Sequence, residues 1–171
     1  MNEADGVAIR LEAPADAAAV HELLGRAFET PAEADLVDRM RRDGDIVLAL
    51  VATDAQAVVG HVAFGRLRIE SAQGQSLALG LAPLAVSETH RRRGVGAALV
   101  REGLDRLRAQ GETLVFVLGD PDYYTRFGFA LETARPFTCV YAGPYFMALR
   151  LSDATPSGGT VRYPSAFDGL A

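Results

Sequence analysis

The sequence predicts an α/β fold in which one mixed sheet of about seven strands carries helices on both faces. Apolar runs of strand length alternate with segments whose apolar residues recur at helical spacing. The order of strand 77–86, helix 94–110 and strand 113–118 predicts a right-handed parallel crossover. The chain has 171 residues, of which 49% are hydrophobic, so it can build a substantial core. We therefore expect residues 1–171 to form a single domain, with a short C-terminal extension from about residue 152.

The first half of the chain is expected to form one strand, two helices and two further strands. Pro14 suits the first turn of a helix, and Thr30 can cap the next helix with Pro31 in its first turn. A nearly continuous apolar run follows, as in a strand that is covered on both faces. The expected ranges are 7–12 for the first strand, 14–28 and 30–42 for the helices, and 46–53 and 57–68 for the next strands.

The second half contains the best helix of the sequence between two apolar strands. The strand before it carries Gly80 and Pro83, and a proline in a central strand implies a bulge or a local loss of pairing. The helix is amphipathic, and Gly111 can end it. Beyond the crossover, the expected ranges are 120–127 for a short helical segment, about 130–132 and 145–151 for strands, 152–160 for a loose connector, and 161–167 for a tail that packs back.

A cluster of cations and two glycines stands between the central strand and the main helix. Arg91–Arg93 are followed by Gly94 and Gly96. Glycines let the backbone approach a ligand closely, and the first N–H groups of a helix lie at the positive end of its dipole. A phosphate placed there collects several hydrogen bonds, and guanidinium groups add matching forks. The chain lacks lysine and has Leu99 in place of a third glycine, which excludes a P-loop and a Rossmann fingerprint.

Two motifs resemble those of the GNAT N-acetyltransferase superfamily. The first is the Arg-x-x-Gly-x-Gly pattern of Arg91–Gly96; the second is Tyr124–Phe129, which fits Tyr-x-x-x-Gly-Phe after the next strand. Over about residues 7–168 the chain also looks like the YhbS-type branch of this superfamily. This likeness includes Leu118-Gly119-Asp120-Pro121, Arg126-Phe127-Gly128-Phe129, Phe146-Met147-Ala148-Leu149 and Gly159-Thr160-Val161-Arg162-Tyr163-Pro164. The resemblance implies a GNAT-like, mostly antiparallel sheet with a splayed central strand pair.

The resemblance also implies an acetyl-CoA-dependent N-acetyltransferase, in which a primary amine attacks the thioester directly within a ternary complex. The backbone N–H near Val86 is expected to bond the thioester carbonyl, and Tyr124 to assist the leaving thiolate. These two are the catalytic candidates, although Tyr124 could instead be a packing residue. The expected contacts of the acetyl-CoA co-substrate are Leu84, Ala85, Val86, Arg91, Arg92, Arg93, Gly94, Val95, Gly96, Ala97 and Tyr124.

The general base has no obvious holder, because the strand 77–86 contains no acidic residue. Glu29, Glu33, His61 and Glu70 are possible substitutes, and water could also take the proton. Glu33 is in addition our candidate for the acceptor site, because it falls in the region that borders that site in the family. The missing acid keeps an alternative open, in which the chain is a non-catalytic sensor that binds acyl-CoA.

Composition narrows the partners that we expect. A formal net charge of −5 and a pI near 5.2 argue against nucleic-acid binding. No apolar run approaches the ~20 residues of a membrane span. Cys139 is the only cysteine, which excludes an internal disulfide and a cysteine zinc cluster, and we expect no metal. We expect a cytoplasmic protein with a small-molecule or protein amine as acceptor, and the resemblance makes a homodimer plausible.

Overall fold

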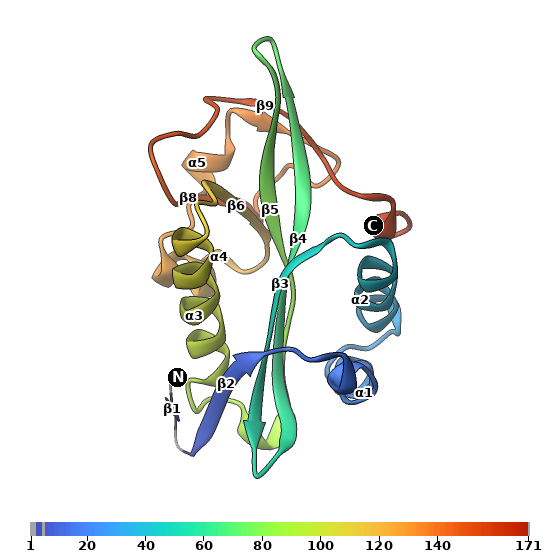
Figure 1. The fold of residues 1–171 in the computed structure, drawn as a ribbon. Helices are drawn as coiled ribbons and strands as arrows, with labels where there is room; N and C mark the ends of the chain where they lie inside the picture. The colour runs from blue at the N-terminus through green and yellow to red at the C-terminus, as the bar shows by residue number, and fades with distance from the viewer. Residues whose placement is uncertain (1–2, 5, 171) are drawn as a thin grey trace.

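Nine strands form one mixed sheet in the computed structural model, which describes residues 3–4 and 6–170 (Figure 1). Seven of them follow the spatial order β1-β2-β3-β4-β5-β6-β8, while β9 joins β4 and β7 joins β9. Their bounds are β1 Glu3–Ala4, β2 Val7–Leu11, β3 Ile46–Asp54, β4 Ala57–Ser71, β5 Gly74–Val86, β6 Leu114–Leu118, β7 Phe137–Thr138, β8 Phe146–Arg150 and β9 Gly159–Arg162. Only the β5–β6 and β7–β9 pairs are parallel among the described pairings, which confirms the predicted fold class.

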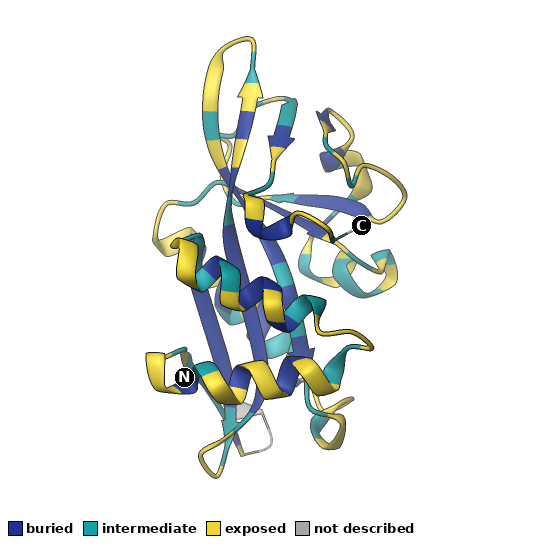
Figure 2. Ribbon diagram, turned by 90° about the vertical axis from the view of Figure 1, so that its right-hand side faces the viewer, coloured by how far each residue is buried: buried dark blue, intermediate teal, exposed yellow. Residues whose placement is uncertain are grey.

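Helices cover both faces of this sheet, as predicted (Figure 1). Helices α1 (Ala17–Ala27) and α2 (Ala32–Asp43) lie on one face, and α3 (Val95–Ala109) lies on the other. Figure 2 shows that α1 and α2 turn exposed residues outward and cover strands that are buried along most of their length. Shorter helical elements are α4 Pro121–Tyr124, α5 Leu131–Ala134, η1 Pro14–Asp16, η2 Glu88–His90, η3 Thr125–Phe127 and η4 Ser165–Phe167.

The prediction of a strand near residues 130–132 is wrong. Leu131–Ala134 form α5, and only Ala130 joins the sheet edge, through an isolated bridge to Ala148. Gly128 adopts a φ of +98° and turns the chain out of η3. Ala130 then accepts and donates one backbone hydrogen bond each with Ala148 before the chain coils. Sequence periodicity needs several residues, so it cannot distinguish a single bridged residue from a short strand.

Several element ends also differ from the prediction. Pro14 begins η1 rather than α1, and α2 begins at Ala32, two residues after Thr30. The Thr30 Oγ1 still accepts a hydrogen bond from the Ala32 N–H, at 3.4 Å. The connector 152–160 ends in β9, and the short strands β1 and β7 were not predicted.

A bulge in β5 separates it from β6. Phe64 pairs with Leu81 and Val62 pairs with Leu84, so one residue of β4 faces the two residues Ala82 and Pro83. The parallel pairing of β5 with β6 ends at Leu81 and Val117, whereas β5 continues to Val86 beside β4. The bulge predicted from Pro83 is therefore present, and the two strands splay beyond it.

The C-terminal tail packs back on the body, as predicted from its apolar residues. Val161 of β9 pairs with Ile69 of β4, which directs the following residues toward α2. Ala166 and Phe167 of η4 are buried in the same cluster as Leu36 of α2. The tail thereby closes one side of the region where β5 and β6 separate.

Candidate active site

The loop between β5 and α3 presents backbone N–H groups at the start of a long helix. Gly94 is the N-cap, with a φ of +79°, and α3 begins at Val95. The first bond of the helix runs from the Ala98 N–H to the Gly94 carbonyl, at 3.0 Å. The N–H groups of the preceding turn have no acceptor four residues earlier within the helix. Such N–H groups can bind an anion, and anion binding at this loop stays a prediction.

Gly96 lies where the helix start, the end of β5 and α4 meet. A Cβ at this position would stand 2.9 Å from the Tyr123 hydroxyl and 3.5 Å from Val86 Cγ2. The absence of a side chain therefore lets these three segments converge. The position of the Tyr123 hydroxyl beside the first turn of α3 was not predicted from the sequence. The only sequence feature that could have indicated this position is that Tyr123 directly precedes the motif tyrosine, Tyr124.

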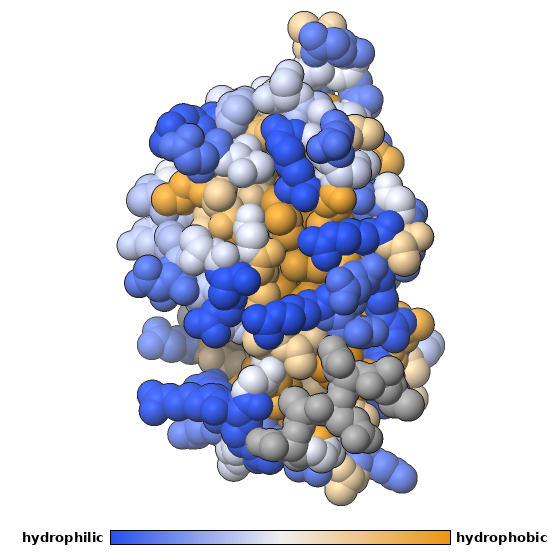
Figure 3. Space-filling view, turned by 90° about the vertical axis from the view of Figure 1, so that its left-hand side faces the viewer, coloured by the Kyte–Doolittle hydropathy of each residue, from blue (hydrophilic) through white to orange (hydrophobic). Residues whose placement is uncertain are grey.

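Two further arginines contribute positive charge near this hydroxyl. The Arg126 guanidinium stacks 4.5 Å from the Tyr123 ring centroid. Both Arg126 and Arg101 act to lower the pKa of Tyr123, although burial is the larger effect and raises it. On the face that carries α3, hydrophilic side chains lie across apolar surface (Figure 3). Arg101 of α3 lies 5.3 Å from the Phe127 ring centroid.

The three predicted arginines are all exposed on the loop. Arg91 folds back over the end of β5, where its Nε donates to the Val86 carbonyl at 3.1 Å. His90 anchors the same loop, because its Nε2 lies 2.8 Å from Asp54 Oδ2 and its Nδ1 lies 3.0 Å from Ser87 Oγ. No sequence motif marks this anchor, because Asp54 comes from the β3–β4 turn, far from His90 in the chain.

The backbone of Val86 points toward the splay rather than toward β4. The Ser87 N–H donates to the Val59 carbonyl at 2.8 Å, so these two residues form a hydrogen-bonded pair of the antiparallel ladder. The adjacent Val86 and Gly60 are then a non-hydrogen-bonded pair, whose N–H and carbonyl groups project away from each other. By the same alternation, the polar groups of Leu84 also project toward the gap. This geometry agrees with the bond that Arg91 makes to the Val86 carbonyl.

A cavity of about 270 Å³ occupies the gap between β5 and β6. Leu84, Leu118 and Tyr124 line it on the side of α4. Glu33 of α2 and Phe167 of the tail line its other side. The splay therefore brings the predicted residues Leu84, Tyr124 and Glu33 to one space. Val86 and Arg91 line a second cavity instead, of about 800 Å³, beside α1.

Tyr124 packs against two aromatic rings and against Gly119. Its ring centroid lies 5.0 Å from that of Tyr123 and 5.9 Å from that of Phe129, both in edge-on contact. The ring also covers Gly119, where a Cβ would be 2.5 Å from Tyr124 Cε2. Burial raises the pKa of Tyr124 well above its usual value, and the neighbouring Tyr123 adds to the shift. The phenol therefore stays protonated at neutral pH and can only donate its proton in a hydrogen bond or to a stronger base.

Glu33 is the acid that the cavity brings closest to this chemistry. Its Oε2 is buried and has no hydrogen-bond partner among the residues that the structure describes. A buried carboxylate oxygen without a partner is costly unless a ligand satisfies it. The other predicted acids differ: Glu29 is exposed, and Glu70 is paired with Arg162 at 3.3 Å on the surface.

His61 lies in the core of the sheet and lines neither cavity among the described ones. Its Nε2 is 3.5 Å from Glu12 Oε1, and Arg41 Nη2 contacts the same oxygen at 2.8 Å. Burial alone would raise the pKa of Glu12, but His61 and Arg41 together hold it below its usual value. This arrangement favours a structural role for His61 rather than that of a base.

Replacing Glu12 with glutamine should destabilise the fold by about 1–3 kcal/mol at pH 7, because it removes the charge that Arg41 and His61 face. The lowered pKa means that this stabilisation is complete above the ordinary carboxyl pKa and is lost as the pH falls through the folded-state value. The urea concentration at the unfolding midpoint should be measured at pH 7, 5, 4 and 3 for both proteins. The difference in this midpoint between variant and parent should shrink below about pH 4. The control is Glu132→Gln, whose exposed pair with Arg135 should contribute less than about 1 kcal/mol. A pH-independent difference would contradict this interpretation.

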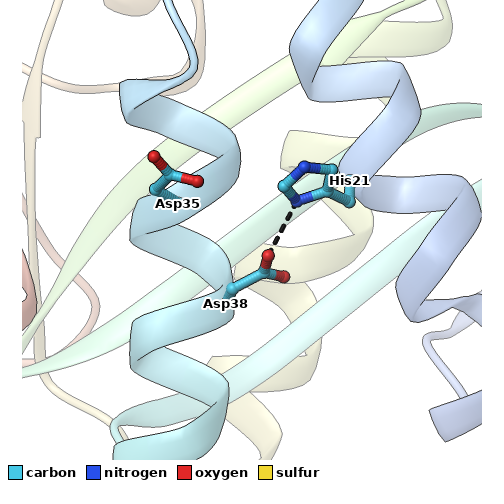
Figure 4. Close-up of side chains that lie close together, drawn as sticks. All are labelled: His21, Asp35 and Asp38. Carbon is cyan, nitrogen blue, oxygen red and sulfur yellow. Dashed lines mark hydrogen bonds and ion pairs between the residues drawn. The ribbon is translucent and has the colours of Figure 1, made fainter.

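A second group of polar residues lies on the outer surface of α1 and α2 (Figure 4). His21 Nδ1 is 2.7 Å from Asp38 Oδ2. A carboxylate oxygen of Asp35 lies within 4.8 Å of the other two side chains' nitrogen and oxygen atoms. Arg41 also contacts Asp38, at 3.1 Å. The group is exposed and internally paired, and it is separate from both cavities.

Comparison with known proteins agrees with the predicted family. The acetyltransferase (GNAT) domain family matches residues 8–131. The uncharacterized N-acetyltransferase YhbS of Escherichia coli K12 is 43% identical over 166 residues, which cover 94% of this chain and 98% of that protein. Another Escherichia coli relative, the uncharacterized N-acetyltransferase YjhQ, is 40% identical over 116 residues, covering 67% of this chain and 64% of that protein.

Solved structures give the same result. The crystal structure of Escherichia coli YhbS in complex with CoA matches with a TM-score of 0.90 and 41% identity, over 100% of this chain and 97% of that one. A GNAT family acetyltransferase from Brucella melitensis in complex with acetyl-CoA matches with a TM-score of 0.78 and 34% identity, over 95% and 98% of the two chains. None of the described helices is long and apolar enough to span a membrane. By sequence and by fold, this chain belongs to the GNAT family of acetyltransferases.

Proposed function

We propose that the protein transfers an acetyl group from acetyl-CoA to a primary amine by direct attack in a ternary complex. The observation that carries this proposal is the cavity at the β5–β6 splay, which has Tyr124 on one side and Glu33 on the other. The CoA and acetyl-CoA complexes of the two related structures support the choice of co-substrate.

The residues at the splay fit a ligand that has phosphates at one end and a thioester at the other. The phosphates would lie on the loop from Arg91 to Ala97, where the first N–H groups of α3 have no acceptor within the helix. The arm would follow Leu84, Ala85 and Val86, because the outward polar groups of this edge of β5 are turned toward the gap. Acetyl-CoA supplies an acetyl group that is activated as a thioester.

Each protein group then has a defined task in the transfer. The bond from the amine nitrogen to the acetyl carbon forms, the carbon–sulfur bond then breaks, and the amine proton passes to Glu33. The sulfur leaves as a thiolate, which takes a proton from solvent. In this proposal the Val86 N–H stabilises negative charge on the carbonyl oxygen, a contribution that is typically worth about 10²- to 10³-fold. Tyr124 donates a hydrogen bond to the departing sulfur. The carboxylate of Glu33, which lines the cavity, holds the amine and accepts its proton.

Thermal unfolding with and without acetyl-CoA tests the co-substrate. At 100 times its Kd, a ligand that binds only the folded state adds about 2.7 kcal/mol, so we expect a clear upward shift in Tm. The release of free CoA on addition of an amine then separates an enzyme from a sensor. A Tm shift without release by any amine would favour the sensor, and no shift at millimolar acetyl-CoA would contradict the proposed site. In either form, we propose that residues 1–171 act as one domain.

A further inference from the structure

The acceptor side of the cavity is built largely by residues that follow the part of the chain matched by the GNAT family. Tyr124 and both splayed strands fall within residues 8–131, whereas Tyr141, Tyr163 and Phe167 lie beyond them. The pairing of β9 with β4 brings the tail back to the cavity. Glu33, from within the matched residues, and the tail, from beyond them, therefore meet on the acceptor side of the cavity.

Three aromatic rings form a continuous wall on this side, which we call the aromatic wall. The Tyr141 and Tyr163 ring centroids are 4.8 Å apart, with their planes at 84°. The Tyr163 and Phe167 centroids are 5.0 Å apart, at 64°. The Tyr141 hydroxyl donates to the Phe167 carbonyl at 3.4 Å, which ties the two ends of the wall together. The wall is thus fixed by its own contacts before a ligand arrives.

The aromatic wall faces a single formal charge. Glu33 is the only charged residue among the described residues that line the cavity, and its Oε2 has no partner within them. A monoamine can give its one cationic or hydrogen-bonding group to this oxygen. A diamine would bury a second ammonium without a partner, and a peptide would bury amide groups against aromatic rings, both at a cost.

The size of the cavity further restricts the acceptor. About 270 Å³ is close to the lower end of the ~300–1,000 Å³ that ligand pockets usually enclose, and the end of the acetyl donor must share this space. On the basis of the proposed function, we infer that the acceptor is a small primary monoamine with an aromatic or compact apolar body. The amine binds Glu33, and the apolar body packs on the aromatic wall of Tyr141, Tyr163 and Phe167.

Acetylation of a panel of amines tests this inference. The probes are 2-phenylethylamine, ethylamine, putrescine and a short lysine peptide, each assayed by CoA release. Burying the phenyl ring should raise kcat/KM for 2-phenylethylamine about 10- to 100-fold over that for ethylamine. Putrescine and the peptide should fall below 2-phenylethylamine. A preference for putrescine or for the peptide would overturn the acceptor class and leave the proposed function standing.

Variants of the wall connect this preference to its structural cause. Phe167→Leu keeps an apolar side chain in the core, and it should reduce the ratio of kcat/KM for 2-phenylethylamine to that for ethylamine at least about 3-fold. Phe167→Ala should reduce the same ratio further, provided that its thermal unfolding transition shows that the variant is folded. The matched control is Tyr145→Leu, since Tyr145 is an exposed aromatic residue of the same region that does not line the cavity. Equal ratios in the Phe167 and Tyr145 variants would overturn the inference.

The binding of acetyl-CoA distinguishes the failure of this inference from that of the proposed function. If acetyl-CoA raises Tm and an amine outside this class releases CoA while 2-phenylethylamine does not, the acceptor class is wrong. If acetyl-CoA raises Tm and no amine releases CoA, the proposed transfer itself fails. If acetyl-CoA does not raise Tm, the proposed function fails and the inference fails with it. Preferential acetylation of 2-phenylethylamine, lost in the Phe167 variants and kept in the Tyr145 variant, is the expected result.

Discussion

Replacing Tyr124 with phenylalanine is expected to lower kcat by about 10²- to 10³-fold, the usual cost of removing one hydrogen-bond donor from charge that develops in the transition state. The ring should keep its place, because it is held by edge contacts with Tyr123 and Phe129 and by its packing on Gly119. The loss would then be the loss of one hydroxyl. Since the raised pKa keeps this hydroxyl protonated, its contribution is a hydrogen bond to the leaving sulfur.

Comparing kcat with acetyl-CoA affinity separates this role from a role in packing. The affinity measured by calorimetry should change only a few fold, because the phosphates are expected to bind elsewhere, on the Arg91–Ala97 loop. Tyr145→Phe is the control, since it removes a hydroxyl from an exposed tyrosine outside the cavity. Tyr124→Phe with the activity of the parent would remove Tyr124 from catalysis. A parallel fall in Tm and activity would assign it to packing.

Replacing Gly94 with aspartate is expected to abolish measurable acetyl-CoA binding. No described atom lies within 4 Å of the position that a Cβ would take, so the added Cβ meets no neighbour, although the φ of +79° makes any side chain strained there. The carboxylate would stand at the helix start that is proposed to bind phosphate. Two unit charges about 4 Å apart repel by about 4 kcal/mol at an effective dielectric constant of about 20. Affinity should therefore fall by at least about 100-fold.

Gly94→Asn provides a close control for this experiment. Asparagine has nearly the same shape as aspartate and tolerates the left-handed backbone required by the φ of +79° to a similar degree. It therefore carries the same conformational cost without the charge. Calorimetric titration should show a modest loss for the asparagine variant and a severe loss for the aspartate variant. Equal affinities of the two variants would mean that the phosphates bind away from the α3 N-terminus.

The long elements were predictable because their signals are local. The helix expected over 94–110 is found as Val95–Ala109, and the strand expected over 46–53 is Ile46–Asp54. The apolar spacing of such segments extends over several turns or several residue pairs, so it outweighs accidental matches. Pro83 likewise indicated the bulge that opens the splay, because a proline cannot donate to the ladder.

The short elements were not predictable in the same way. The four residues Leu131–Ala134 are compatible with either a strand or a helix, and the prediction of a strand there was wrong. β7 and β9 exist through their pairing with each other and with β4, which joins distant parts of the chain. Tertiary contacts rather than local preference decide such segments.

The sequence by itself determined the family of this protein and located its glycine-containing loop and its motif tyrosine. These features are carried by consecutive residues, such as Arg91–Gly96 and Tyr124–Phe129, whose local backbone geometry is largely set by glycines, capping and helix propensity. Only the tertiary structure decided that Tyr124 and Glu33 share one cavity and that the tail encloses it with Tyr163 and Phe167. The cavity is formed by the divergence of β5 from β6 and by the return of the tail, which are packing events between distant segments with no local signature.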